Sequence, residues 1–457
     1  MWRFDLFHGD MESRREFIKK IIIFTSMISL KSEAHGALQR KVTRDPLCIL
    51  SRALNGSPDR NLAKVIEMLG GIEKIIGPYD VVVIKPNVQW WNQGAPNLSA
   101  LKTFVDLIME RPGGFQGEVV ITENCHRGKT PWTSMSSGWA QSFQRNSNIP
   151  GINNMNDLSS ILKKRYGKQF STCHWIDVGA GGKRVFGPAD GNGYIYCDGT
   201  NGVPLITCDN RGKGNNHRTT IMTYPVFTTD KGTIIDFRNG VWGKGSYTGQ
   251  PLRFINLSAL NHHSTYCGAT SAVKNILGIT DLSGGPDPHN KGRLTGNYYN
   301  FHSFPFDKWA HGPEQGMLGK EIGIFMNTVR KPDLNITSAE WVGMSSRVDP
   351  PVAHTGTILA CTDPVALDYH ATKYILYPNS KIAIHNPDNQ KSPMHQYLVK
   401  CAESGSFLFD EKKVRVVSYD FKTGSFQGDD ELVIHGDKQW GSDIKPLLKY
   451  FFLRYLV

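Results

Sequence analysis

Short runs of β-branched and other apolar residues recur along the chain and alternate with segments of helical periodicity. Apolar runs bounded by turn residues predict buried strands at 80–86, 117–123, 173–179, 253–257, 321–327, 356–362 and 414–420. Apolar residues at helical spacing predict helices over 59–72, 98–111 and 364–376. Strands that alternate with helices are typical of an α/β fold, so we expect a largely parallel central sheet flanked by helices.

Two segments interrupt this alternation. Residues 179–250 are crowded with Gly, Asn and Asp and predict a Gly-rich β insertion, with a hairpin turn at Asp230-Lys231-Gly232. Residues 281–316 predict a long irregular loop, which inside a compact domain is usually a lid or a substrate loop. The expected organisation is a leader at 1–37, a first part of the α/β domain at 38–178, the insertion at 179–250 and a second part at 251–457.

The amino-terminal segment has the pattern of an export signal. Arg14 and Arg15 precede a short apolar run at 21–30, and the small residues Ala34 and Ala37 offer a cleavage zone. The run is too short to span a bilayer, which favours a signal peptide over a membrane anchor. Its Ser-Arg-Arg-x-Phe-Ile-Lys order resembles a twin-arginine signal, which the export machinery reads as an address. The alternative is a chance arginine pair before an ordinary amphipathic helix.

This signal predicts a periplasmic or secreted protein with no stable membrane span after cleavage. Residues 1–10 add nothing to the signal, so the start codon is either Met1 or Met11. Because the twin-arginine route carries folded proteins, often with a cofactor in place, it also favours a bound metal or other cofactor.

Composition narrows the class of protein. A hydrophobic fraction of 39% and a charged fraction of 20% indicate a soluble globular protein. The formal net charge is +11, but the cationic residues are dispersed and form no long block. Dispersed charge argues against nucleic-acid binding and is compatible with a small anionic ligand.

The eight cysteines contain no C-x-x-C pair, so neither a zinc ribbon nor a ferredoxin-type cluster is predicted. Disulfides in an oxidising compartment remain open, and their connectivity does not follow from the spacing. Cys197 and Cys208 flank a Gly-rich turn region and are the first pair to test.

Polar side chains follow two of the predicted strands. Lys85 and Asn87 end one strand, and Glu123 ends the next. In doubly wound sheets ligands bind beyond the carboxyl ends of the strands, so these residues are candidates for a site. The structural alternative for any one of them is a polar residue that solvates a strand end.

Residues 256–275 show the same pattern, in which polar residues follow a predicted strand. Small residues lead into a helix that carries Lys274 and Asn275, and Thr270 or Ser271 can act as its N-cap. Exposed N–H groups at such a helix start bind anions, and Lys274 would add a point charge.

The same stretch leaves a metal site open. His262 and His263 are adjacent and would point in opposite directions on an extended chain, so both cannot easily bind one ion. His263 with Cys267 and a remote carboxylate could hold a divalent metal. Asp363 precedes Pro364, an order that suits a helix N-cap and explains Asp363 without any chemistry.

Taken together, these motifs resemble the family called domain of unknown function 362. The resemblance rests on Lys-Pro-Asn at 85–87, the segment 256–275, the strand at 334–337 and Asp-Pro-Val-Ala-Leu-Asp at 363–368, and it spans roughly residues 80–375. Relatives place lysines near the positions of Ala259 and Asn261, and many carry a ferredoxin-like cysteine cluster that this chain lacks. The family has no settled activity, so the resemblance names no reaction.

These observations predict an exported enzyme that acts on a small anionic substrate. Lys85, Asn87, Thr270, Lys274 and Asn275 are expected to bind the anion. His263 is expected to act as a general base or a metal ligand, with Glu123 or Asp363 orienting it or completing the metal site. The alternative is a non-catalytic periplasmic protein that binds a ligand or handles a cofactor, and nucleic-acid binding is the weakest reading.

Overall fold

The computed structural model describes residues 48–124, 138–209, 217–282, 298–300, 316–428 and 432–455, without side chains at 208–209, 217–219 and 298–300. The predicted leader and most of the predicted loop at 281–316 lie outside the described residues. So do Cys125 and His126, polar residues that follow Glu123 at the end of the predicted strand. Residues 46–457 form one compact unit.

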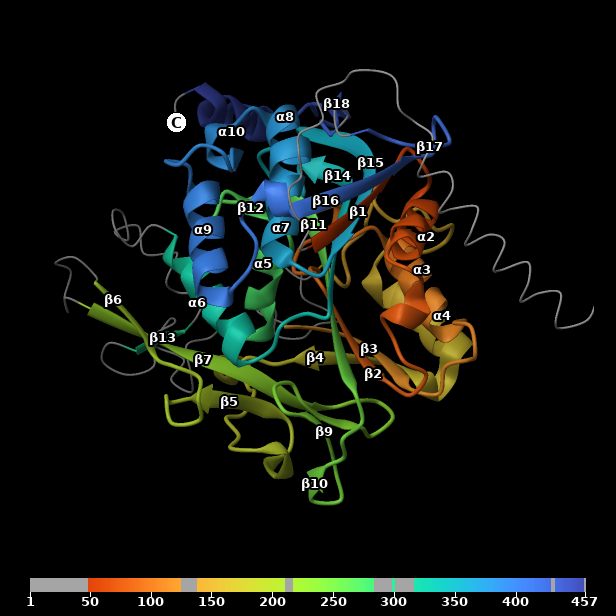
Figure 1. Cartoon of the computed structure of the whole chain (residues 1–457), viewed down its shortest axis with the longest axis vertical. Helices are drawn as coiled ribbons and strands as arrows, with labels where there is room; N and C mark the ends of the chain where they lie inside the picture. The colour runs from red at the N-terminus through yellow and green to blue at the C-terminus, as the bar shows by residue number, and fades with distance from the viewer. Residues whose placement is uncertain are drawn as a thin grey trace, which may run out of the picture. The chain divides into compact units, whose positions relative to one another are not determined.

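A large sheet runs through the middle of this unit (Figure 1). Its strand order is β17 (Ser425–Phe426), β16 (Val414–Asp420), β1 (Cys48–Leu54), β15 (Val352–Cys361), β14 (Leu334–Gly343), β11 (Leu252–His262), β2 (Val81–Pro86), β3 (Glu118–Asn124) and β4 (Phe170–Trp175). Two short strands extend it: β12 (Ala269–Thr270) pairs with β11, and β18 (Asp437–Gln439) pairs with β15.

The strands from β14 through β11, β2 and β3 to β4 are all parallel, and β15 runs antiparallel to both of its long neighbours. The predicted largely parallel sheet is therefore confirmed.

Helices cover both faces of this sheet. One face carries α2 (Pro58–Met68), α3 (Leu98–Met109) and α4 (Met155–Tyr166), and the other carries α5 (Ala272–Asn275), α6 (Met317–Thr328), α7 (Pro364–Ala371) and α9 (Pro393–Gly405) (Figure 1). Two further helices are α8 (Tyr377–Ser380) and α10 (Ile444–Tyr455). Strand β2 shows why two layers form, because Val82 and Ile84 pack into one core while Val81 and Val83 pack into the other.

Within the described part of the chain, no helix is long and apolar enough to cross a membrane.

A second sheet holds the strands of the Gly-rich segment. It contains β5 (Gly193–Cys197), β6 (Ile206–Asp209), β7 (His217–Thr228), β8 (Ile234–Asp236), β9 (Gly240–Gly243), β10 (Ser246–Tyr247) and β13 (Tyr298–Asn300). Strands β7 and β8 pair antiparallel around residues 229–233, as the predicted hairpin requires.

Cys197 and Cys208, the first pair to test, form no disulfide, since Cys197 is a free buried thiol. Cys197 lies opposite Met222 of β7 and Cys208 lies opposite Arg218. Arg218 and Met222 are four residues apart on the extended strand β7, so the two cysteines opposite them are separated along the strand by about 13 Å. This distance is beyond the reach of a disulfide.

One predicted strand is wrong. Residues 321–327 lie in α6, where Leu318, Ile322 and Phe325 recur at helical spacing and are buried. A short apolar run fits both a buried strand and a buried helix, and here the helix packs closely on α9. Gly319 and Gly323 permit this approach, because a Cβ on either would overlap the backbone or a serine side chain of α9.

Candidate functional site

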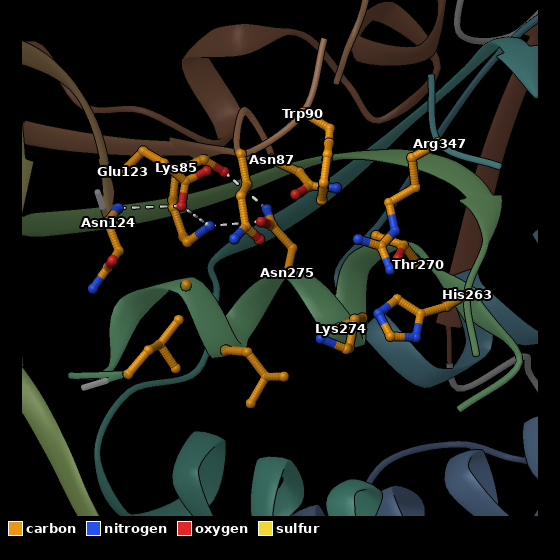
Figure 2. Close-up of a pocket in the computed structure, with 14 residues that line it drawn as sticks. Lys85, Asn87, Trp90, Glu123, Asn124, His263, Thr270, Lys274, Asn275 and Arg347 are labelled. Carbon is orange, nitrogen blue, oxygen red and sulfur yellow. Dashed lines mark hydrogen bonds and ion pairs between the residues drawn. The ribbon is translucent and has the colours of Figure 1, made fainter. Parts of the chain in front are cut away.

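A pocket lies beyond the carboxyl ends of β2 and β3 (Figure 2). Because β11, β2 and β3 are parallel neighbours, the polar residues that follow them meet at one edge of the sheet. The lining residues are Lys85, Asn87, Gln89, Trp90, Glu123, Asn124, His263, Thr270, Lys274, Asn275, Leu277, Gly278, Leu282 and Arg347. Most of the predicted site residues are therefore brought together.

One end of the pocket holds a buried ion pair. The Lys85 ammonium lies 2.8 Å from Oε1 of Glu123 and donates to Oδ1 of Asn275 at 2.6 Å and to the Pro86 carbonyl at 3.1 Å. Glu123 also accepts from the backbone N–H groups of Val88 and Asn124. Lys85 thus directs its three N–H donors at protein acceptors, so its structural task is to hold Glu123 and Asn275.

Burial changes the acidity of both partners in this pair. It lowers the pKa of Lys85 and raises the pKa of Glu123, while their mutual attraction acts in the opposite direction. Desolvation is the larger effect for each group, so the two proton affinities move toward one another. Shifted proton affinities of this kind are common among groups that take part in acid–base chemistry.

Gly278 forms the floor beneath this pair. A Cβ at this position would lie 2.6 Å from Oε1 of Glu123 and 2.7 Å from Nζ of Lys85. These distances are far shorter than a van der Waals contact, so the close approach of this turn to the pair requires glycine.

A row of buried amides fixes Asn275 against the sheet. Its Nδ2 donates to the Lys85 carbonyl at 3.1 Å and to Oδ1 of Asn256 at 2.8 Å. Asn256 in turn donates to Oδ1 of Asn335 at 2.8 Å, and Asn335 lies opposite Cys361 in the sheet register. Because both ends of the Asn275 amide bond to protein, this residue links α5 to β2 and positions Lys85.

The other end of the pocket is cationic. Figure 2 shows Arg347, Lys274 and His263 gathered on the side away from Glu123 and Asn124. The Arg347 guanidinium lies over the Trp90 ring, 5.2 Å from its centroid, and this stacking orients its planar fork. Arginine and lysine side chains that converge in this way suit a carboxylate or phosphate group.

The histidine at this end has a defined tautomer. The backbone N–H of Ser264 donates to Nδ1 of His263 at 2.7 Å, so Nδ1 is an acceptor and carries no proton. The proton of the neutral ring is therefore on Nε2. In this tautomer Nε2 is the donor nitrogen of the ring and Nδ1 is the acceptor nitrogen. The general-base role of His263 stays a prediction.

The start of α5 does not receive an outside anion. The carboxylate of Asp368 accepts the N–H groups of Ala272 at 2.8 Å and Val273 at 2.9 Å. Burial raises the pKa of Asp368 to about 7, and these hydrogen bonds oppose the rise. The predicted anion site at this helix start is therefore occupied by a side chain of the protein.

Two other predicted residues lie outside the pocket lining. Asp363 caps α7 through the N–H groups of Val365 and Ala366, both at 2.9 Å, and also accepts from Leu408. Cys267 is completely buried, and desolvation raises the pKa of its thiol to about 11. Among the described residues, no group of three or more His, Cys, Asp or Glu is arranged to hold a metal ion.

His262, the neighbour of His263, serves the structure behind the pocket wall. Its Nδ1 lies 2.9 Å from Nε2 of His385, whose Nδ1 lies 2.7 Å from the Ser380 hydroxyl. The two adjacent histidines thus point to different environments, as an extended chain predicts.

Sequence reasoning missed Trp90, Arg347 and Gly278. Trp90 was visible in the run 87–91 that follows β2. Arg347 belongs to no motif and enters the pocket from the connection between β14 and β15.

Comparison with protein families gave one match. Residues 252–373 match the model of a domain of unknown function, DUF362. This segment runs from β11 to the end of α7 and contains His263, Thr270, Lys274, Asn275 and Arg347. Lys85 and Glu123 lie outside it, so the match is shorter than the resemblance predicted from the sequence. No curated protein and no solved structure matched the chain.

Proposed function

We propose that the protein is an exported enzyme that acts on a small anionic substrate in the pocket beyond β2 and β3. The observation that supports this proposal is that one pocket has a cationic end and an opposite end with the buried Lys85–Glu123 ion pair. Arg347, Lys274 and the Nε2–H of His263 bind the anionic group of the substrate. The Lys85–Glu123 pair moves a proton on the part of the substrate that reaches the opposite end.

Substrate entry supplies the trigger for proton transfer. A polar ligand atom that approaches Lys85 displaces one of its protein acceptors. This exchange changes the relative proton affinities of Lys85 and Glu123. Glu123 keeps its two backbone N–H donors throughout, so its orientation does not depend on Lys85 alone.

Export is the second part of the proposal. It is supported by the twin-arginine pattern at Arg14 and Arg15, and it predicts that Arg14→Lys/Arg15→Lys protein stays in the cytoplasm. Cell fractionation with an antibody measures this directly. Equal amounts of both proteins in the periplasm would remove this part of the proposal and leave the pocket chemistry intact.

Anion binding is tested by calorimetric titration of inorganic phosphate and of succinate. Arg347→Met should weaken binding of at least one probe by about tenfold or more, the loss of one charge-assisted contact. Arg165→Met is the matched control, because Arg165 lies on α4 in an exposed ion pair with Glu110. Wild-type protein that binds neither probe, or variants that bind equally well, would contradict the cationic end.

Catalysis is tested by incubating the protein with a small-molecule extract and following anions by mass spectrometry. Wild-type protein should deplete an anion that Glu123→Gln protein binds but leaves unchanged. The alternative is a non-catalytic binding protein, which the occupied donors of Lys85 and Asn275 would suit. An anion retained by the wild type without depletion would establish that alternative.

A further inference from the structure

The last helix of the described chain, α10, is attached to the protein along one side. Tyr450 is completely buried and donates from its hydroxyl to the Ser380 carbonyl at 3.0 Å. It packs in a small core with Met344, Ile382 and Ile384, against which Leu453 also rests. These contacts define the inward face of the helix.

The outward face of α10 is apolar and exposed. At about 100° per residue, its large side chains fall within roughly a third of the helix circumference, on the side away from Tyr450. They are Ile444 (73% exposed), Leu448 (63%), Phe451 (44%), Phe452 (55%) and Tyr455 (66%). We call these five residues the α10 stripe. An exposed cluster of this size is unusual on a soluble protein unless something binds it.

Stacked aromatic rings extend the α10 stripe to Trp440. The ring of Phe451 is stacked nearly parallel to Trp440 on one side and to Tyr455 on the other, at centroid distances of 6.5 and 6.2 Å. Trp440 is itself 41% exposed. Tryptophan and tyrosine rings are enriched where proteins meet the headgroup region of a bilayer.

Cations border the stripe on both sides. The helical spacing places Lys445 and Lys449 along one border and Arg454 along the other, where Arg454 donates to the Tyr450 hydroxyl at 3.0 Å. The helix contains no Asp or Glu between residues 444 and 455. A second copy of the chain placed against the stripe would bring two such cationic borders together, which disfavours self-association.

We propose that the α10 stripe binds the surface of an anionic lipid bilayer, with α10 lying in the plane of the interface. Apolar and aromatic side chains then enter the headgroup boundary, and the exposed Lys445, with Lys449 beside it, faces the lipid phosphates. This is attachment to a membrane and not a span, in agreement with the helix lengths of the described residues. The proposal is independent of the reaction proposed above.

The position of α10 gives this attachment a consequence for the pocket. Tyr450 of α10 packs with Met344, which lies three residues before Arg347 in the same connection. Burial, and then the charge of Arg347, lower the pKa of Lys449. The cationic end of the pocket is therefore near the membrane-binding helix, and docking would place that end beside the anionic surface.

Vesicle sedimentation tests the proposal. The protein is freed of residues 1–37, since the apolar run of the leader would itself bind lipid, and it keeps the whole compact unit of residues 46–457. It should sediment with vesicles of phosphatidylcholine and phosphatidylglycerol at low salt. It should sediment less with pure phosphatidylcholine, and less again at high salt.

Variants separate the apolar and charged contributions. Leu448→Gln/Phe452→Gln and Lys445→Glu should each raise the half-saturating concentration of anionic lipid by about tenfold. Tyr79→Gln is the matched control, because Tyr79 is 58% exposed and precedes β2. Thermal unfolding of each variant shows whether it is folded.

Three outcomes would overturn the proposal: no sedimentation of the wild type, equal binding by folded stripe variants and control, or a wild-type dimer that Leu448→Gln/Phe452→Gln converts to a monomer. The last would assign the stripe to a second copy of the chain.

Discussion

Asp368 of α7 accepts a hydrogen bond from the backbone N–H of Ala272 at 2.8 Å, so the anion at the start of α5 belongs to the protein itself. Its other carboxylate oxygen accepts from Val273 at 2.9 Å. Lys274 and Asn275 belong to the same short helix and line the pocket. Asp368 therefore positions two pocket residues without lining the pocket.

The substitution Asp368→Asn should loosen α5. It keeps the size of the side chain but turns an NH₂ group toward one of the two backbone N–H donors. Leaving a buried donor unpaired costs about 1–3 kcal/mol, so the free energy of unfolding should fall by that amount. Urea denaturation measures the loss, and Asp59→Asn in the first turn of α2 is the control. An unchanged free energy of unfolding would show that Asp368 is not needed to hold α5.

The Lys85–Glu123 pair should show strong coupling in a double-mutant cycle. Lys85→Met leaves Glu123 buried without its cation, and Glu123→Gln leaves Lys85 without its anion, because both side chains are about 1–4% exposed. Removing one partner of a buried pair costs about 3–5 kcal/mol, whereas removing both leaves no unpaired charge. The double variant should therefore be more stable than the sum of the single losses predicts. Additive losses within about 0.5 kcal/mol would contradict the pairing.

Much of this site could be predicted from the sequence because parallel strands impose a simple geometry. Lys85 and Glu123 each follow a buried strand, and neighbouring parallel strands bring their carboxyl ends to one edge. Lys274 lines the same pocket because the segment that follows β11 runs back across this edge of the sheet. The sequence could not show that Lys85 and Asn275 are saturated by protein groups, since hydrogen bonds between residues 190 positions apart leave no local pattern.

The other features that the sequence did not reveal also depend on contacts between distant parts of the chain. Asp368 was visible in the sequence only as a helix residue, and its contact with α5 joins elements almost 100 residues apart. Arg347 lies in a connection without a motif and reaches the pocket only because β14 and β15 form a hairpin. The apolar run at 321–327 was ambiguous by periodicity, and packing of α6 against α9 decided it.

Gly278→Ala should disturb the Lys85–Glu123 pair. The added Cβ would lie 2.6 Å from Oε1 of Glu123, so the pair must shift and strain the hydrogen bonds that hold it to Asn275 and Val88. We expect a loss of about 1–3 kcal/mol in the free energy of unfolding, the usual cost of overpacking. Gly187→Ala is a matched control, since a Cβ there meets nothing within 4 Å and its φ of −176° is ordinary extended backbone. Equal stability of both variants would mean that the pair adapts freely.

The His262–His385 pair should make the protein sensitive to acid. Burial lowers the pKa of His385 to about 3 and the pKa of His262 well below its usual 6.5. Between these values the unfolded chain binds more protons than the folded one, so stability is fully present above pH 6.5 and falls as the pH drops toward 3. Asp368, whose pKa is raised, contributes the opposite slope between 3.8 and about 7.

The histidine contribution is isolated by comparing wild type with His385→Gln. Near pH 5 each such histidine adds a slope of about 1.4 kcal/mol per pH unit, and Asp368 titrates equally in both proteins. Urea denaturation at several pH values should therefore give the variant a shallower acid dependence, whatever its stability at neutral pH. Parallel curves for the two proteins would mean that His385 is already protonated in the folded state. In that case the buried, hydrogen-bonded series of His262, His385 and Ser380 would contain a positively charged imidazole.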